Sequence, residues 1–212
     1  MAAITEKTRL EPSTSVQIDV MPERRRFTPD EYLRMAEVGV LKPAEKTELI
    51  CGEVRTMLPT GRPHWVRVAE LVMRLSRFLP SSDWCVVSQS TIEVNDSMPE
   101  PDIVVLRGNS HTFLQRDPKP EEIALVIEVA DSSLSFDRGS KLALYASAGV
   151  SDYWIVNIRD KQIETYSSPE KSPETSQFRT VKTFRQGELA THTFSGDLLF
   201  TIEVNDLFAS QP

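Results

Sequence analysis

Four segments between residues 99 and 156 decide the fold of this chain. They read Pro99-Glu-Pro-Asp-Ile-Val-Val-Leu106, Ala124-Leu-Val-Ile-Glu-Val129, Asp137-Arg-Gly-Ser-Lys-Leu-Ala-Leu-Tyr145 and Asp152-Tyr-Trp-Ile-Val156. The first, second and fourth contain apolar runs that are typical of strands covered on both faces. The third lies in a stretch that predicts a helix from about Phe136 to Ala148, closed by Gly149. This order predicts an α/β (mixed α+β) fold in which helices flank a mixed sheet, with an added β-hairpin region.

The residues before this region predict two helices and a hairpin. Thr28-Pro29 provides a capping hydroxyl and a first-turn proline, so a helix should begin there and end near Gly39. Glu48 to Met57 alternates around Cys51-Gly52, which indicates a β-hairpin. A second helix is expected over 63–79, and residues 84–94 are expected to form a strand. The apolar stripe predicted for that helix consists of Trp65, Val68, Val72, Leu75 and Leu79.

The residues after it predict a hairpin and a short closing unit. Residues 162–166 and 178–184 should pair, joined by a mobile loop over 167–177 that is rich in Ser, Pro, Glu and Lys. A last strand over 198–202 and a turn over 204–208 complete the chain. Residues 1–26 are polar and aperiodic, which predicts a flexible arm before a single domain over 27–212.

The bulk composition excludes several classes of protein. The chain has 212 residues, 40% of them hydrophobic, and no apolar run long enough to cross a bilayer, so no membrane partner is expected. The N-terminus lacks the apolar core of a secretory signal, and two cysteines are too few for a disulfide framework; both predict a cytoplasmic location. The net charge of -7 argues against nonspecific coating of nucleic acid. Acidic metal ligands would contribute to that charge, so a nuclease is not excluded.

Two carboxylates stand at the ends of predicted strands. Asp102 follows Pro101, which lacks the N–H that a central ladder requires, so Asp102 should begin its strand. By itself it is also an ordinary turn acid. Glu128 is more informative, because every neighbour in its strand is apolar and a buried carboxylate costs several kcal/mol without a compensating partner. Either Glu128 pairs with Arg138 or Lys141, or it binds a metal ion.

Lys141 allows two interpretations. It lies four residues after Asp137 and could pair with it along the helix. Alternatively, its ammonium group lies over the carboxylates, where it would steady an attacking water or a pentavalent phosphate. Two carboxylates on neighbouring strands suit Mg²⁺ or Mn²⁺, which prefer oxygen ligands.

These residues resemble the Uma-two family of restriction-endonuclease-like proteins, a branch of the PD-(D/E)XK nuclease superfamily. The resemblance spans about residues 28 to 208 and is most specific between Glu128 and Trp154. It implies a metal-dependent endonuclease acting on phosphodiester bonds of nucleic acid, with DNA as the expected substrate, and assembly as a homodimer. The matching residues are Glu48–Glu53, Pro63-His64, Pro101-Asp102, Ile127–Val129, Asp137–Leu142, Tyr145-Ala146 and Gly149–Trp154.

Carried over by position, the resemblance makes Asp102 and Glu128 metal ligands and the backbone carbonyl of Val129 a third. The chain departs from the superfamily pattern at Ala130, where the catalytic lysine would stand; the resemblance implies that Lys141 replaces it from the next helix. His64 and Glu48 also match family positions. The resemblance implies that they orient water or add an outer carboxylate to the site, and a structural role is the alternative for each. Trp154 is expected in the core.

Two other classes of function stay open at this level. A nuclease-fold protein could bind nucleic acid or a protein partner without cutting it, and the acidic net charge and Ala130 favour this alternative. A purely structural role would pair Glu128 with an arginine instead of placing it in a cleft.

Overall fold

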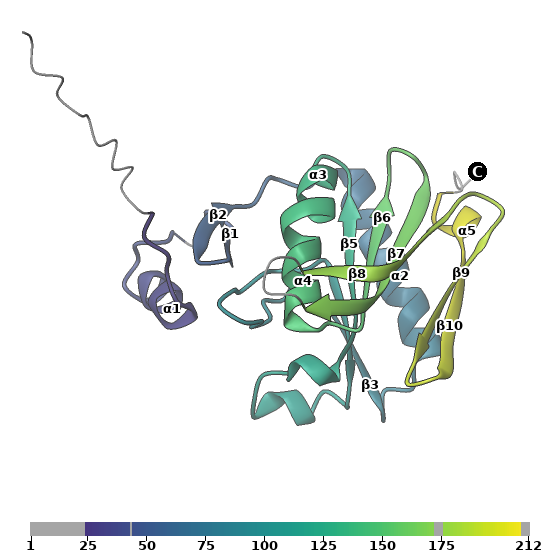
Figure 1. Ribbon diagram of the computed structural model, residues 1–212, viewed down its shortest axis with the longest axis horizontal. Coiled ribbons are helices and arrows are strands. Elements are labelled where there is room, and N and C mark those ends of the chain that lie inside the picture. Colours follow the sequence, from purple (N-terminus) through teal and green to yellow (C-terminus); the bar gives the residue numbers. More distant parts are fainter. Residues whose placement is uncertain (1–23, 43, 172–175, 209–212) are drawn as a thin grey trace, which may run out of the picture.

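A six-stranded mixed sheet forms the centre of the protein (Figure 1). The computed structural model describes residues 24–42, 44–171 and 176–208. Among the described strands of this sheet, β5 and β6 run parallel and the other neighbouring pairs are antiparallel. The mixed sheet flanked by helices is therefore confirmed. In spatial order the strands are β3 (Trp84–Ser88), β4 (Ile103–Arg107), β5 (Ile123–Ala130), β6 (Asp152–Asn157), β7 (Gln162–Lys171) and β8 (Ser176–Phe184).

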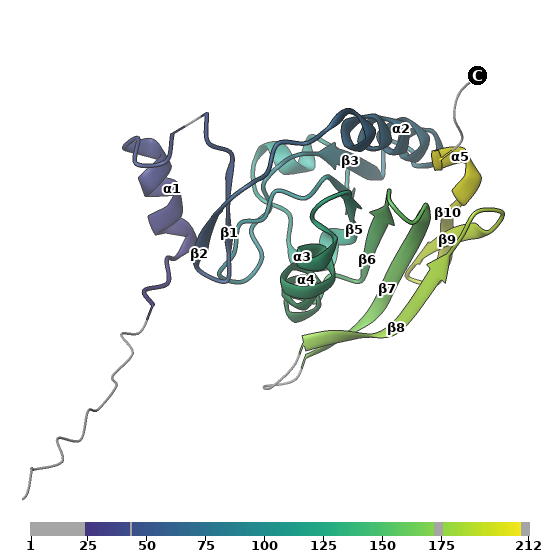
Figure 2. The same ribbon diagram turned by 90° about the horizontal axis from the view of Figure 1, so that it is seen from above.

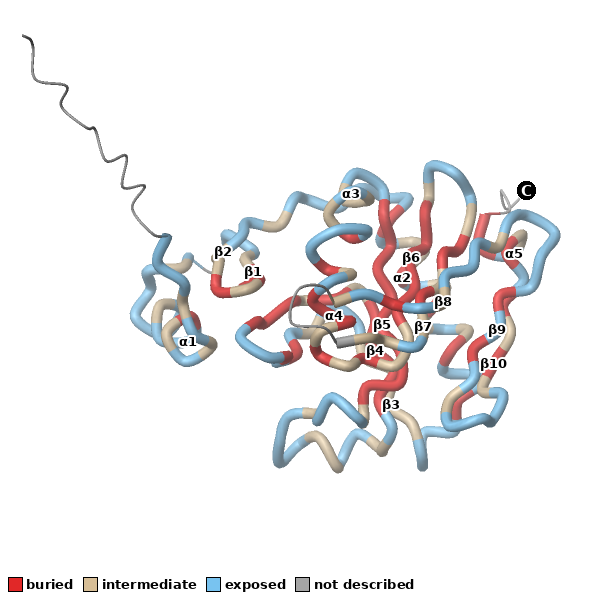
Figure 3. The backbone as a smooth tube through the Cα atoms, viewed as in Figure 1, coloured by how far each residue is buried: buried red, intermediate tan, exposed pale blue. Residues whose placement is uncertain are grey.

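Helices cover the two faces of this sheet (Figure 2). The long helix α2 (Arg62–Phe78) packs Leu71 and Leu75 against one face. The other face is covered by a three-part helical segment that crosses between the parallel strands. It consists of α3 (Leu134–Phe136), a π-helical turn (η3, Asp137–Lys141) and α4 (Leu142–Ala148), which ends at Gly149 in the left-handed conformation. A hydrophobic core lies on each face of the sheet. Because side chains alternate along a strand, β5 contributes to both cores, and every residue of β5 is buried (Figure 3).

A second hairpin closes the α2 side of the molecule. It comprises β9 (Leu189–Phe194) and β10 (Asp197–Glu203), followed by α5 (Val204–Phe208). Phe200 of β10 packs edge-on against Trp154 at 5.6 Å between ring centroids. Trp154 is thus a core residue, as predicted. The last strand and turn were predicted, but β9 was not.

The N-terminal elements stand apart from the sheet (Figures 1 and 2). They are α1 (Pro29–Glu37) and a hairpin of β1 (Thr47–Ile50) and β2 (Glu53–Thr56). Thr28 and Glu31 form a reciprocal capping box at the start of α1, and Gly52 has a positive φ of 75° in the hairpin turn. Both predicted elements are confirmed. Backbone hydrogen bonds between Leu49 and Met98 tie the hairpin to the rest of the chain.

The predicted buried stripe of α2 is wrong at its first position. Trp65 is 53% exposed, and the neighbouring His64 is buried instead. The helix is therefore rotated so that His64, Val68, Leu71 and Leu75 face inward. The physical reason is a polar contact, because the buried His64 ring forms a hydrogen bond with the Asp102 carboxylate.

Three other boundaries differ from the prediction. The strand expected over 84–94 ends at Ser88, because Gln89 adopts a positive φ of 49°. The loop expected over 167–177 is mostly strand: β7 continues to Lys171 and β8 begins at Ser176. The rest of that loop, 172–175, lies outside the described residues, as do residues 1–23 of the predicted arm. Two 3₁₀ turns, Thr112–Leu114 and Pro120–Glu122, interrupt the connection from β4 to β5.

Within the described ranges, no helix has the length and apolarity needed to span a bilayer.

Candidate active site

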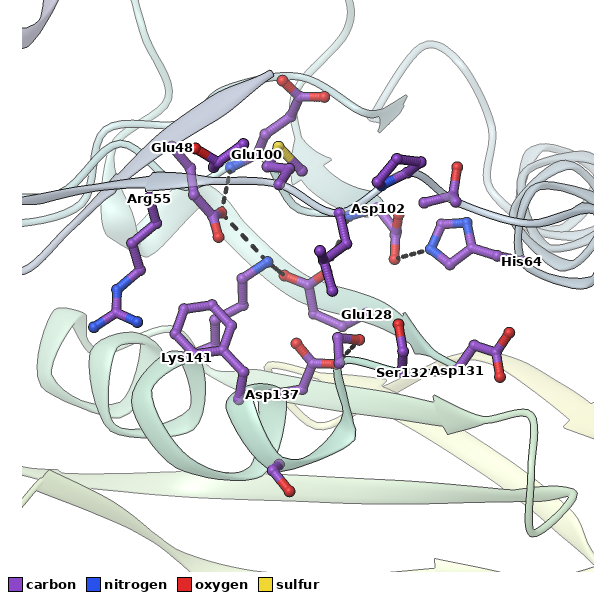
Figure 4. A pocket seen from close by; sticks show the side chains of 18 of the residues that line it. Glu48, Arg55, His64, Glu100, Asp102, Glu128, Asp131, Ser132, Asp137 and Lys141 are labelled. Carbon is purple, nitrogen blue, oxygen red and sulfur yellow. Dashed lines mark hydrogen bonds and ion pairs between the residues drawn. The ribbon is translucent and has the colours of Figure 1, made fainter. Parts of the chain in front are cut away.

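A cavity of about 590 Å³ lies between the N-terminal hairpin and the helical segment after β5 (Figure 4). One wall is β2 with the segment 57–61, and the other is the turn after β5 with the π-helical turn. Five residues proposed from the sequence come together around this cavity. Its lining includes Glu48, His64, Asp102, Glu128 and Lys141.

Asp102 lies immediately before β4. The register pairs Ile103 with Ile127, so Asp102 stands opposite Glu128. Its Oδ2 accepts a hydrogen bond from the backbone N–H of Val129 at 2.8 Å and lies 3.0 Å from Nε2 of His64. Asp102 was predicted to begin its strand, and the structure places it one residue before the first residue of β4, Ile103. His64 and Val129 fix its rotamer.

Glu128 lies on the face of β5 that is turned toward the π-helical turn. It is 4% exposed. Its Oε1 accepts hydrogen bonds from Lys141 Nζ at 2.8 Å and from the Tyr145 hydroxyl at 3.0 Å, and its Oε2 accepts one from the Asp102 N–H at 3.4 Å. Burial raises the pKa of Glu128 to about 8; Asp102 adds to this rise, and Lys141 opposes it. Glu128 is therefore a paired carboxylate that lines a cavity.

Lys141 joins two acids from separate parts of the chain. Its Nζ also lies 3.4 Å from Oε2 of Glu48, which accepts a further hydrogen bond from the Glu100 N–H at 3.4 Å. Burial alone would lower the pKa of Lys141, but the carboxylates of Glu128 and Glu48 raise it, so the side chain is a cation.

The fold shows which basic residue pairs with Glu128, while metal binding by Glu128 stays a prediction. Arg138 makes a bidentate ion pair with Glu164 of β7, not with Glu128. Asp137 accepts a hydrogen bond from Ser133 Oγ at 2.6 Å, and none of the described ion pairs joins it to Lys141. Lys141 therefore pairs with Glu128 and Glu48 instead of Asp137.

Three groups of this site were not among the site residues predicted from the sequence. Tyr145 donates to Glu128 from α4, one helical turn after Lys141, and that spacing could have indicated it. Asp137 is buried beside the cavity, and burial raises its pKa to about 6. Arg55 lines the cavity from β2, and no feature of the sequence alone indicates this.

The oxygen donors here fit a hard divalent cation. In an extended strand the N–H and C=O of one residue point to the same side. The Val129 N–H points to Asp102, whereas the Ala130 carbonyl accepts from Ile158 on the β6 side, so the Val129 carbonyl is directed toward Asp102. No three His, Cys, Asp or Glu side chains form a ready metal cluster in the part of the chain that is described. A bound ion would therefore take two carboxylates, one carbonyl and several waters, as Mg²⁺ commonly does.

Comparisons with known proteins agree with this fold. A crystal structure described as "a putative nuclease belonging to DUF820" from Anabaena variabilis ATCC 29413 superposes with a TM-score of 0.63. The match has 18% sequence identity and covers 86% of this chain and 98% of that one. No curated protein matches the sequence. The family Uma2, described as "Putative restriction endonuclease", matches residues 29–203, which confirms the resemblance found in the sequence. The chain therefore belongs to the Uma2 family.

Proposed function

We propose that this protein is a metal-dependent endonuclease that hydrolyses phosphodiester bonds in DNA. The observation that carries the proposal is the position of Lys141, whose Nζ lies 2.8 Å from Oε1 of Glu128 in a cavity that Asp102 also lines. This position supports the proposal that Lys141 supplies the cation that the superfamily pattern would place at Ala130. The family description, which names restriction endonucleases, supports DNA as the substrate.

The charge balance of the cavity supports a metal requirement. Among the described residues, six carboxyl groups line it against two permanently charged cations, Arg55 and Lys141, so acids outnumber these cations even when Glu128, with a pKa raised to about 8, is protonated. A phosphodiester is itself an anion and would be repelled by this surface. Bound Mg²⁺ or Mn²⁺ would offset the repulsion, polarise a phosphate oxygen and lower the pKa of a bound water. The acids lining the cavity are Glu48, Glu100, Asp102, Glu128, Asp131 and Asp137.

Each side chain then has a definite task. Asp102, Glu128 and the Val129 carbonyl would hold the ion. Lys141 stabilises the negative charge that develops on the phosphate in the transition state, because its ammonium group is already in place before that charge appears. The hydrogen bond between His64 and Asp102 fixes the orientation of the Asp102 carboxylate. Metal sites commonly need such a partner to orient a ligand. Tyr145 and Glu48 hold Glu128 and Lys141 in place through the contacts described above.

The experiment is cleavage of supercoiled plasmid DNA with Mg²⁺, Mn²⁺ or EDTA. We expect nicking that EDTA stops and that Asp102→Asn or Glu128→Gln reduces at least about 100-fold. Glu170→Gln is the matched control, because Glu170 pairs with Arg179 in the β7–β8 hairpin and does not line the cavity. Cleavage that survives EDTA or Glu128→Gln would disprove the proposal.

A protein that binds DNA without cutting it is the second candidate. It is favoured by the engagement of Lys141 with two carboxylates and by the net charge of -7. Metal-dependent binding with no nicking by the wild-type protein would establish this alternative. An RNA substrate in the same assay tests the choice of DNA. The homodimer, the single domain and the cytoplasmic location stay predictions.

A further inference from the structure

We propose that Arg55 binds a backbone phosphate of the nucleic acid at the mouth of the cavity, next to the bond that is cut. This inference rests on the proposed function, because it assumes a nucleic-acid substrate. It gives Arg55 the first contact with an entering phosphate, ahead of the more deeply buried Lys141.

Arg55 is the accessible one of the two permanent cations that line the cavity. Lys141 is buried and its ammonium group is engaged by Glu128 and Glu48. The Arg55 side chain is 44% exposed. A phosphate that enters the cavity therefore meets Arg55 before it meets Lys141.

The hairpin register directs Arg55 into the cavity. Arg55 of β2 is the direct partner of Glu48 of β1, and directly opposed residues in an antiparallel pair project from the same face. Glu48 reaches Lys141 from that face, so Arg55 is turned toward the same helical segment. Figure 4 shows both side chains entering from the hairpin, opposite Lys141 and Asp137.

An aromatic ring supports the guanidinium from across the cavity. The Arg55 guanidinium carbon lies 5.1 Å from the ring centroid of Phe136, which immediately precedes the π-helical turn. Contact of a guanidinium with an aromatic ring leaves the planar edge available for hydrogen bonds. Phe136 thus holds the cation in place while its donors stay accessible.

Most donors of Arg55 are available to a ligand. Among the described residues, its one hydrogen-bond partner is Glu53, whose Oε2 lies 2.9 Å from Nη2. Exposed ion pairs of this kind contribute only about 0 to 1 kcal/mol. A guanidinium presents five N–H donors in a geometry that matches two phosphate oxygens, so a phosphate can compete with Glu53.

The test measures how DNA affinity depends on salt. A short duplex is titrated with wild type and Arg55→Gln in Ca²⁺, at NaCl concentrations from 50 to 200 mM. Each lost phosphate contact reduces the slope of log K against log salt by about 0.9 for duplex DNA. We therefore expect the Arg55→Gln slope to be about 0.9 smaller in magnitude and its affinity to be weaker at every salt concentration.

Two further variants make the result specific. Arg179→Gln removes the same charge from a side chain that pairs with Glu170 outside the cavity, and we expect a slope equal to that of wild type. Arg55→Lys keeps the charge and should keep the slope, but it should lose affinity because lysine lacks the bidentate edge. Equal slopes for Arg55→Gln and wild type overturn the inference, and so does an equal reduction by Arg179→Gln.

The outcome also separates this inference from the proposed function. A wild-type protein that cuts DNA while Arg55→Gln retains the full slope overturns only the role of Arg55. A wild-type protein that neither binds nor cuts nucleic acid overturns both. Thermal melting of each variant verifies that it is folded.

Discussion

Among single residues, the most informative is the acid Glu128, which is buried in an apolar strand. Glu128 stands in a strand whose other members are apolar, and that mismatch alone indicates a partner. The identity of the partner does not follow from the strand, because Arg138 and Lys141 lie at similar distances along the chain. Only the fold shows that Arg138 turns to Glu164 while Lys141 turns to Glu128. Arg55 could not be predicted at all, since its role depends on hairpin register and on Phe136 across the cavity.

Replacement of Lys141 should destabilise the folded protein, because two buried carboxyl groups lose their cation. Lys141→Met leaves Glu128 and Glu48 buried without their cation, so the free energy of unfolding should fall by about 3 kcal/mol. Glu128→Gln should cost less, because Lys141 keeps Glu48 as its partner. Urea unfolding of both single variants and the double variant measures the coupling, which we expect to be about 1–3 kcal/mol. Strictly additive effects would contradict the pairing.

At the scale of elements, the predictions held where hydrophobic pattern alone decides structure. The strands β4, β5 and β6 were predicted from their apolar runs, and α1 from its capping residues. The rotation of α2 was not, because periodicity favoured the large apolar Trp65 over His64 for burial. The hydrogen bond from His64 to Asp102 compensates for burying the imidazole, and no sequence pattern reveals that contact.

The strand β9 was missed for a related reason. Its buried positions are Ala190 and His192, which give a weak alternating signal. His192 is 1% exposed, and neither ring nitrogen has a hydrogen-bond partner within the described ranges. Its ring lies against Phe200 and Trp154, with centroids 5.2 and 6.0 Å away. Burial lowers the pKa of His192 to about 4.

This buried imidazole predicts a pH-dependent stability. The imidazole of His192 has a pKa of about 6.5 in the unfolded chain and about 4 in the folded chain. Between these two pH values the unfolded chain binds a proton that the folded chain does not bind, so the free energy of unfolding falls as the pH is lowered from 6.5 to 4. The full loss is about 3 kcal/mol. His192→Phe should remove this component, as measured by urea unfolding at pH 7, 5.5 and 4.5. The exposed His111 provides a control in His111→Gln, and a pH-independent difference between wild type and His192→Phe would disprove the assignment.

At the scale of the whole molecule, the family and the fold could be predicted, whereas the cavity could not. The resemblance covers nearly the whole described chain and gives the sheet and its helices. The cavity depends on how the N-terminal hairpin sits over the π-helical turn. That arrangement follows from contacts such as Leu49 with Met98, which join segments far apart in sequence.

The concentration of carboxylates predicts that divalent ions stabilise the folded protein without any nucleic acid. A ligand at 100 times its Kd adds about 2.7 kcal/mol to the free energy of unfolding, provided that it binds only the folded state. We expect the melting temperature to rise with Mn²⁺ in wild type and in Glu170→Gln, but not in Asp102→Asn. Equal rises in wild type and Asp102→Asn would place the ion elsewhere on the acidic surface.

The contact between Glu48 and Lys141 also has a consequence for the folding pathway. It joins the first hairpin to a helix that is synthesised much later, whereas the pairs β6–β7 and β7–β8 involve near neighbours in sequence. Contacts between distant segments carry a larger loop-closure cost and tend to form late. The cavity should therefore close only in the final stage of folding. A half-folded chain would keep Glu48 away from Lys141, and the activity proposed above would begin only once the hairpin has docked.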